Sequence, residues 1–238
     1  MHVIYAMPHL SFIIPAYNEA LRIAPSLAKA QEYFATQSYT TEIIVVNDGS
    51  KDATSQVVAE IDGITLLEQP RNMGKGAAVR RGMMEARGEY RIFSDADFST
   101  PIHETARVLA RLYESADVCI GSRGVDTTLV KKHQPWYRET LGKMVNVIVQ
   151  TAFIPGISDT QCGFKGFRAA AAEAVFSRAK LNGWMFDLEA LYIASKLHLQ
   201  IDEIPVEWYN DERSTVSFRH SWQILREIFS IKRLHRNL

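Results

Sequence analysis

The chain has 238 residues, 47% of them hydrophobic, and its 27 basic residues balance its 27 acidic residues. This length and composition predict one sizeable core in a single domain spanning residues 1–238. The balanced charge gives no reason to expect nucleic acid as a partner. Two isolated cysteines exclude a disulfide framework and favour a reducing cytoplasm. No apolar run reaches the roughly 18 residues of a transmembrane helix, so we expect no membrane-spanning segment.

Apolar, β-branched runs alternate with amphipathic stretches along the chain. In the first half, predicted strands over residues 10–14, 42–46, 64–68 and 90–94 alternate with predicted helices over 20–34, 53–61, 77–86 and 102–114. This alternation is typical of βαβ units. We therefore predict an α/β fold with a mostly parallel central sheet and helices on both faces. The second half adds predicted strands over 117–123 and 201–208, a loop leading into a strand over 158–168, and helices over 139–153 and 184–197.

The most informative stretch is residues 90–101, where a buried strand ends in Asp95-Ala96-Asp97 and a Ser-Thr-Pro turn. Two buried carboxylates this close repel each other, so both stay ionised only beside a cation. Mg²⁺ and Mn²⁺ prefer oxygen ligands, which predicts a metal-bound diphosphate at Asp95 and Asp97. The alternative is a solvated turn in which the aspartates make local hydrogen bonds. Because parallel strands end at one crevice, the metal site is favoured by further polar residues at strand ends, namely Tyr17, Glu19 and Asp48.

Two loops allow more than one interpretation. In Gly74-Lys75-Gly76 the glycines favour a tight turn with positive φ before a helix, although backbone N–H groups facing a phosphate are the alternative. The roles of Asn72 and Lys75 stay open. The basic, aromatic segment over residues 129–138 is typical of a mobile loop, which acts either as a lid or lipid-headgroup contact or as a plain surface loop.

A basic amphipathic helix is predicted at about residues 216–236. Its apolar stripe contains Phe218, Trp222, Leu225 and Phe229, widened by Ile224 and Ile228. Five basic residues face one acid, Glu227, which is typical of a helix lying on an anionic membrane surface. The alternative is that the stripe packs on the domain or on a second copy in a homodimer. The five basic residues are Arg219, Arg226, Lys232, Arg233 and Arg236.

Four motifs resemble, in order and spacing, those of the family 2 inverting nucleotide-sugar glycosyltransferases, which have the GT-A fold. They are residues 13–19 (IIPAYNE), 45–50 (VVNDGS), 72–76 (NMGKG) and 95–97 (DAD). The resemblance covers nearly the whole chain. Its later motifs are similar to the dolichyl-phosphate glucosyltransferase branch, with the dolichyl-phosphate mannosyltransferases as close neighbours. These later motifs are residues 97–101 (DFSTP), 121–123 (GSR), 159–165 (DTQCGFK) and 186–189 (FDLE).

The resemblance implies roles for individual residues. Asp95 and Ala96 would contact the nucleotide, and Asp97 would bind the metal on the diphosphate. Ser99 stands where mannosyltransferase relatives place a glutamine as a further metal ligand. The nucleoside would be surrounded by Pro15, Tyr17, Glu19, Val46 and Asp48, and the phosphates would be held by Arg123, Arg213 and Arg219.

The implied chemistry displaces a nucleoside diphosphate from C1 of a sugar. A divalent ion and arginines stabilise the negative charge that develops on this leaving group. A polyprenyl phosphate acceptor is already ionised and needs no strong base, whereas a hydroxyl acceptor needs a carboxylate. Asp187 and Glu189 are the candidates, but on a helix they point roughly 200° apart, so only one faces the site. We prefer Asp187 and interpret Glu189 as an ordinary helix-surface charge.

We therefore expect an enzyme that transfers glucose from UDP-glucose to a polyprenyl (dolichyl) phosphate at the cytoplasmic membrane surface, with Mg²⁺ or Mn²⁺. The alternative donors are GDP-mannose and N-acetylhexosamine nucleotides, and the alternative acceptors are soluble molecules or polysaccharides. Outside this class, a non-catalytic nucleotide-sugar binding module is the main alternative, since fold does not imply function. A nucleotidyltransferase is disfavoured because the first strand is not followed by a basic, glycine-rich loop.

Overall fold

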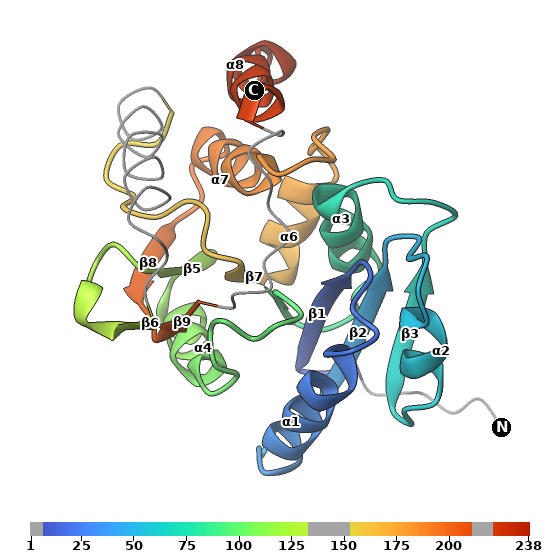
Figure 1. Ribbon diagram of the computed structural model, residues 1–238. Coiled ribbons are helices and arrows are strands. Elements are labelled where there is room, and N and C mark those ends of the chain that lie inside the picture. The colour runs from blue at the N-terminus through green and yellow to red at the C-terminus, as the bar shows by residue number, and fades with distance from the viewer. Residues whose placement is uncertain (1–6, 133–152, 211–220) are drawn as a thin grey trace, which may run out of the picture.

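The computed structural model describes residues 7–132, 153–210 and 221–238. Its centre is a seven-stranded sheet with the order β3-β2-β1-β4-β7-β5-β8 (Figure 1). Only β7 runs antiparallel to its neighbours β4 and β5, which confirms the predicted mostly parallel sheet. The strands are β1 (Leu10–Ala16), β2 (Thr41–Asn47), β3 (Ile64–Glu68), β4 (Tyr90–Ser94), β5 (Val118–Ser122), β7 (Phe164–Arg168) and β8 (Ile201–Pro205).

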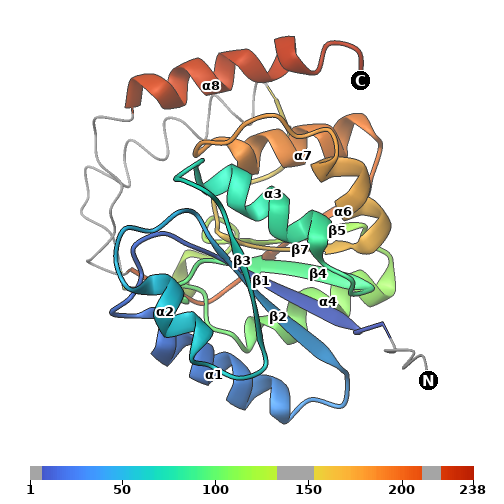
Figure 2. The same cartoon turned by 90° about the vertical axis from the view of Figure 1, so that its right-hand side faces the viewer.

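Helices cover both faces of the sheet, as the alternation of the sequence predicts (Figure 2). One face carries α3 (Lys75–Glu85), α6 (Ala169–Phe176) and α7 (Phe186–Lys196). The other carries α1 (Ile23–Ala35), α2 (Thr54–Ala59) and α4 (Glu104–Glu114). Strand β1 is buried throughout because its side chains alternate between these two cores. Ile13 packs in the first core, and Phe12 and Ile14 pack in the second.

A second, two-stranded sheet pairs β6 (Val130–Lys132) with β9 (Trp208–Tyr209), and a short 3₁₀ turn, η1 (Thr127–Leu129), precedes β6. Of the loop expected over residues 129–138, Leu129 ends this turn and Val130–Lys132 form a strand, and the remainder lies outside the described residues. The backbone N–H of Tyr209 donates to the carbonyl of Ser99, 2.8 Å away. This bond ties the small sheet to the loop that follows β4.

The first helix starts later than the periodicity of the sequence predicts. The helix predicted over residues 20–34 begins at Ile23 as α1, and Leu21, which lies before it, is 93% exposed. The reason is local: Asn18 has a positive φ of 55°, and the backbone N–H of Glu19 donates to the Thr54 hydroxyl at 2.8 Å. These features hold an irregular turn after β1 and delay the helix.

The C-terminal helix α8 (Ser221–Leu234) forms the outermost layer of the molecule, over α7 (Figures 1 and 2). Its inner face contributes Ile228 and Ile231 to the core, whereas Phe229 is 75% exposed. Phe218 and the side chains of Trp222, Ile224 and Leu225 lie outside the described residues. Packing on the domain therefore accounts for one face of α8 and leaves Phe229 on the outside. In the described ranges, no helix is long and apolar enough to cross a membrane.

Candidate active site

The ends of three parallel strands lie side by side at one edge of the sheet. Ala16 at the end of β1 pairs with Asn47 in β2, and Asn47 pairs with Glu68 in β3. The backbone N–H of Asp48 continues this alignment by donating to the Ala16 carbonyl at 2.8 Å. On the other side of β1, Ile13 pairs with Phe93, so the loop carrying Asp95 and Asp97 emerges at the same edge. The strand-end polar residues therefore converge, as the sequence predicts.

Asp48 is buried and holds the turn that leads into α3. Its Oδ1 atom accepts hydrogen bonds from the Gln69 side chain at 2.9 Å and from the Met73 N–H at 2.7 Å. Its Oδ2 atom accepts the Gly74 N–H at 2.8 Å. Burial raises the pKa of Asp48, and the three donors partly offset that effect. Asp48 therefore stabilises the loop between β3 and α3 by hydrogen bonds.

Gly74 occupies a position that demands glycine. Its φ is 103°, and a Cβ atom there would lie 2.3 Å from the Asn182 carbonyl oxygen. The turn interpretation is therefore confirmed for Gly74. Lys75, whose role the sequence leaves open, follows directly and places its Nζ atom 2.5 Å from Oδ1 of Asp95. The protein itself thus supplies one cation to the carboxylate pair.

The two carboxylates of the Asp-Ala-Asp loop differ in how they are compensated. Burial alone would lower the pKa of Lys75, but Asp95, Asp187 and Asp97 together raise it, so the ammonium stays charged beside Asp95. Asp97 has a raised pKa because it is largely buried and because the Asp95 charge repels it. Its Oδ1 atom accepts the Ser99 N–H at 2.9 Å. Lys75 therefore pairs directly with Asp95, whereas Arg22 lowers the pKa of Asp97 and partly offsets the effects of burial and of Asp95.

Arg123, at the end of β5, is oriented by a buried carboxylate that the sequence did not single out for a role. Asp159 accepts from the Arg123 Nε atom at 2.6 Å, from Nη2 at 2.9 Å and from the backbone N–H at 3.1 Å. Burial opposes ionisation of Asp159, but Arg123 holds its pKa to about 2. The guanidinium also lies 5.3 Å from the centre of the Trp208 ring. Glu203 in turn accepts the Asp159 N–H at 2.8 Å.

Asp187, our preferred base, belongs to a buried ion pair. Lys165 is fully buried in β7 and places its Nζ atom 2.5 Å from Oδ1 of Asp187. The same ammonium lies 5.5 Å from the centre of the Phe93 ring. Burial raises the pKa of Asp187, although Lys165 and Lys75 oppose that effect. The carboxylate is thus held by a lysine and does not stand free as a base.

The interpretation of Glu189 as a surface charge is wrong. Its side chain is fully buried, because α8 covers the side of α7 that would otherwise face solvent. Its oxygens accept the backbone N–H of Leu181 at 2.8 Å, and His235 from the chain's C-terminal part lies 2.6 Å away. As the predicted angular separation requires, Asp187 and Glu189 have different partners.

The remaining predicted site residues differ in accessibility. Pro15 and Val46 pair with each other within the sheet, and the Val46 side chain lies in the core beneath α3. Tyr17 is 37% exposed at the end of β1, and Glu19 is ion-paired with Arg22. Ala96 is buried between the two aspartates. Arg213 and Arg219 lie outside the described residues.

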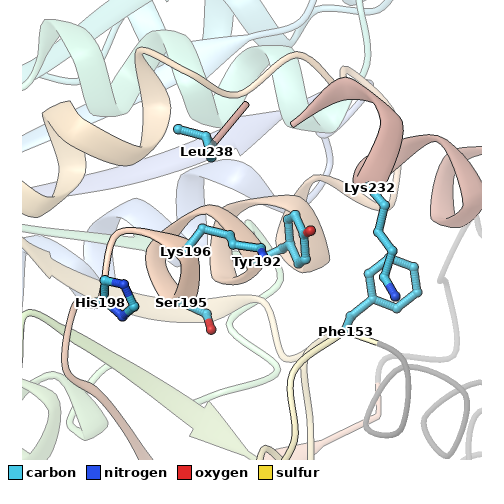
Figure 3. A pocket seen from close by; sticks show the side chains of 7 residues that line it. All are labelled: Phe153, Tyr192, Ser195, Lys196, His198, Lys232 and Leu238. Atoms are coloured by element: carbon cyan, nitrogen blue, oxygen red, sulfur yellow. The ribbon is translucent and has the colours of Figure 1, made fainter. Parts of the chain in front are cut away.

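A groove of about 650 Å³ lies elsewhere, at the later turns of α7 and next to α8 (Figure 3). Tyr192, Ser195 and Lys196 of α7 line it together with Lys232 of α8, whose Nζ atom is 5.0 Å from the centre of the Phe153 ring. None of the strand-end residues contributes to it. The groove is thus a separate feature from the candidate active site.

The fold is that of the GT-A glycosyltransferases. The glucosyl-3-phosphoglycerate synthase of Mycobacterium tuberculosis, solved with UDP, superposes with a TM-score of 0.70 at 15% identity over 95% of this chain and 80% of its own. The mannosyl-3-phosphoglycerate synthase of Rubrobacter xylanophilus superposes with a TM-score of 0.75 at 18% identity, over 97% of this chain and 76% of its own. A further structure of the mycobacterial enzyme, with Mn²⁺, UDP-glucose and phosphoglyceric acid, gives 0.66 at 14% identity over 94% and 78%.

The chain belongs to glycosyl transferase family 2, whose model matches residues 11–176, and it is a glycosyltransferase. It is 38% identical to a dolichyl-phosphate beta-glucosyltransferase of Trichomonas vaginalis over 87% of this chain and 67% of that protein. It is 37% identical to the dolichyl-phosphate beta-glucosyltransferase of Dictyostelium discoideum over 94% and 74%. The resemblance drawn from the motifs is thereby confirmed.

Proposed function

We propose that the protein transfers glucose from UDP-glucose to a dolichyl or other polyprenyl phosphate, with inversion at C1. The observation that carries this proposal is the similarity to relatives named dolichyl-phosphate beta-glucosyltransferases over most of the chain. The site supports it by collecting Asp95, Asp97, Lys75 and Arg123 near the carboxyl ends of parallel strands, where such sheets bind ligands. A non-catalytic binding module is disfavoured by membership of a transferase family with these aspartates intact.

The donor set at Asp95 and Asp97 fits a divalent cation. Burial and the neighbouring Asp95 carboxylate both raise the pKa of Asp97, so a divalent cation between the two carboxylates would relieve their repulsion. Mg²⁺ is usually held by one or two carboxylates and completed by substrate phosphates. Asp97 and Asp95 would hold Mg²⁺ or Mn²⁺, which offsets the charge developing on the departing diphosphate. The mycobacterial fold neighbour was solved with Mn²⁺ and UDP-glucose, which supports this choice of cofactor and donor.

The buried pair of Lys165 and Asp187 favours an acceptor that needs no base. Removing a hydroxyl proton would require Asp187 to leave a lysine 2.5 Å away, at considerable electrostatic cost. The phosphate of a polyprenyl phosphate is ionised near neutral pH and attacks without that step. Arg123, which Asp159 orients, is a proposed phosphate ligand, as are Arg213 and Arg219.

We propose that the outer face of α8 makes peripheral contact with an anionic membrane surface, on the cytoplasmic side. Phe229 is 75% exposed and has exposed basic neighbours at Arg226 and Arg233. A Phe229→Asp variant should reduce sedimentation with anionic liposomes. Met84→Asp, at an exposed methionine of α3, is the matched control and should sediment like the wild type. Unchanged sedimentation of Phe229→Asp would remove the membrane role of α8.

The decisive experiment titrates UDP, GDP and their glucose and mannose conjugates calorimetrically, with and without Mn²⁺, and then tests transfer to polyprenyl phosphate. We expect Mn²⁺-dependent binding of UDP-glucose and glucosyl polyprenyl phosphate as product. A preference for GDP-mannose would show that the proposed donor is wrong. Brisk transfer to a soluble acceptor, with none to polyprenyl phosphate, would show that the proposed acceptor is wrong.

A further inference from the structure

Glu189 is a buried anchor for the chain segment between α6 and α7. Its Oε2 atom accepts the Leu181 N–H at 2.8 Å, and its Oε1 atom accepts the Lys180 N–H at 3.0 Å. His235 places Nε2 2.6 Å from Oε1. Since an ionised carboxylate accepts hydrogen bonds only, the histidine is the donor in this contact. Glu189 therefore fixes the backbone at residues 180–181 and ties it to His235, the residue after α8.

The anchored segment lies directly against the first turn of α3. The Gly76 N–H donates to the Asn182 carbonyl at 2.9 Å, and Nη2 of Arg80 donates to the Asn182 side-chain oxygen at 2.7 Å. A Cβ atom on Gly76 would lie 2.8 Å from the Leu181 carbonyl oxygen. The backbones of α3 and of residues 181–182 are thus in close contact immediately after Lys75.

The same segment also surrounds the Lys75 side chain. The Lys75 ammonium lies 5.8 Å from the ring centres of both Trp184 and Phe186, while its Nζ atom contacts Asp95. On its other side, the Gly74 N–H is held by Asp48. Two buried carboxylates therefore set the position of Lys75. Asp48 holds the preceding residue, Gly74, and Glu189 holds residues 180–181, next to the contact of Asn182 with Gly76.

Helix α8 supports this segment through a second carboxylate. Glu227 accepts the Met185 N–H at 3.1 Å, and its side chain lies against Gly183, where a Cβ atom would come within 2.1 Å of Oε1. The Lys180 side chain donates to the Leu234 carbonyl at 3.0 Å. Residues 180–186 are thus clamped between α3, α7 and α8.

We propose that Glu189 is a positioning residue of the transfer site, which acts through residues 180–186 to hold Lys75 against Asp95. It touches neither Asp95 nor Asp97, so its effect on transfer is indirect. The inference rests on the proposed function for the reaction that is assayed. Of the two carboxylates of α7 that were candidate bases, Glu189 thus has a positioning role.

The test uses Glu189→Gln in the full chain. Glutamine keeps the side-chain volume but removes the charge and replaces one carboxylate oxygen by an NH₂ donor, so the charge-assisted hydrogen bonds that hold residues 180–181 weaken. We expect kcat/KM for the donor to fall about tenfold, because small displacements in a site are costly. The matched control is Glu42→Gln: Glu42 is also mostly buried and accepts the Arg87 N–H at 2.7 Å, but it lies at the opposite end of β2. Its kcat/KM should stay within about twofold of the wild type.

A double-mutant cycle with Lys75→Met separates positioning from general destabilisation. If Glu189 acts through Lys75, the double variant should lie within about twofold of Lys75→Met alone. The proposal would be overturned if kcat/KM of the double variant were a further tenfold below that of Lys75→Met. It would also be overturned if Glu42→Gln lost as much kcat/KM as Glu189→Gln.

Hydrogen exchange gives a readout that does not depend on activity. The amides of residues 74–76 should exchange faster in Glu189→Gln than in the wild type and stay unchanged in Glu42→Gln. Unchanged exchange there in Glu189→Gln would refute the inference. If the wild type transfers no glucose, the proposed function fails, and exchange at these amides decides the positioning role alone. Should Glu189→Gln not fold, Glu189→Asp replaces it, since it keeps the charge but withdraws the carboxylate by one methylene.

Discussion

The pairing of Asp159 with Arg123 makes a quantitative prediction about stability. Asp159 has a pKa of about 2 in the folded protein, against about 3.9 in an unfolded chain. This difference corresponds to about 2.6 kcal/mol of folding free energy at pH 7. The side chain is only 10% exposed, so solvent screening reduces the value little. Asp159→Asn should therefore lower the free energy of unfolding by roughly 2 to 3 kcal/mol, or the melting temperature by roughly 5 to 10 °C.

The pH dependence tests the cause. The folded-state pKa of Asp159 is depressed, so its stabilising effect is present above the unfolded pKa and is lost as pH falls toward 2. Urea unfolding followed by tryptophan fluorescence should show a constant difference between wild type and variant from pH 7 to 5.5 and a smaller one at pH 3. Glu114→Gln is the control, because Glu114 pairs with Arg111 but is 63% exposed, and such a pair contributes less than about 1 kcal/mol. A difference below about 1 kcal/mol at pH 7 for Asp159→Asn, or one that does not shrink in acid, would refute this account.

Two further substitutions test the strand-end loop and the turn before α3. Asp97→Asn should abolish transfer yet preserve or raise the melting temperature at pH 7, because burial and Asp95 raise the pKa of Asp97 and so disfavour its charged form. That gain should disappear as pH falls through the raised pKa, and a large loss of stability would instead make Asp97 structural. Gly74→Ala should cost more in calorimetric melting temperature than Gly156→Ala. Both glycines have positive φ, but only at Gly74 would Cβ meet a carbonyl, at 2.3 Å. Equal losses would mean that the close approach is unimportant.

The sheet and its strand-end cluster could be predicted because their signals are local. Each strand is an apolar run closed by polar residues, and parallel strands necessarily end at one edge. The aspartates at 95 and 97 were therefore predictable as a pair. Their compensation by Lys75 was not, because that contact depends on how α3 lies against the residues before α7.

The buried lysine of β7 shows a signal that was present but incomplete. Lys165 stands between Phe164 and Gly166 in a run that is otherwise apolar up to Arg168, which indicates a buried cation in need of a carboxylate. Which carboxylate it meets depends on the antiparallel insertion of β7 between β4 and β5, a non-local feature. Glu189 was misjudged for a similar reason. A helix charge is assigned to solvent by default, whereas α8 covers α7 from a distant part of the sequence.

The pair formed by Lys165 and Asp187 allows structure and catalysis to be separated. Lys165→Met leaves Asp187 as a buried, unpaired charge and should cost roughly 3 to 5 kcal/mol at pH 7. The pKa of Asp187, already raised by burial, should rise further, so this cost should shrink as pH falls. The double variant with Asp187→Asn removes both charges and should be more stable in urea unfolding than Lys165→Met alone. If the losses of unfolding free energy of the two single variants simply added in the double variant, Lys165 and Asp187 would not be coupled. If the acceptor is a phosphate, the double variant should retain transfer, because no proton has to be removed. If Asp187 is instead the base for a hydroxyl acceptor, the double variant should lose transfer although it folds.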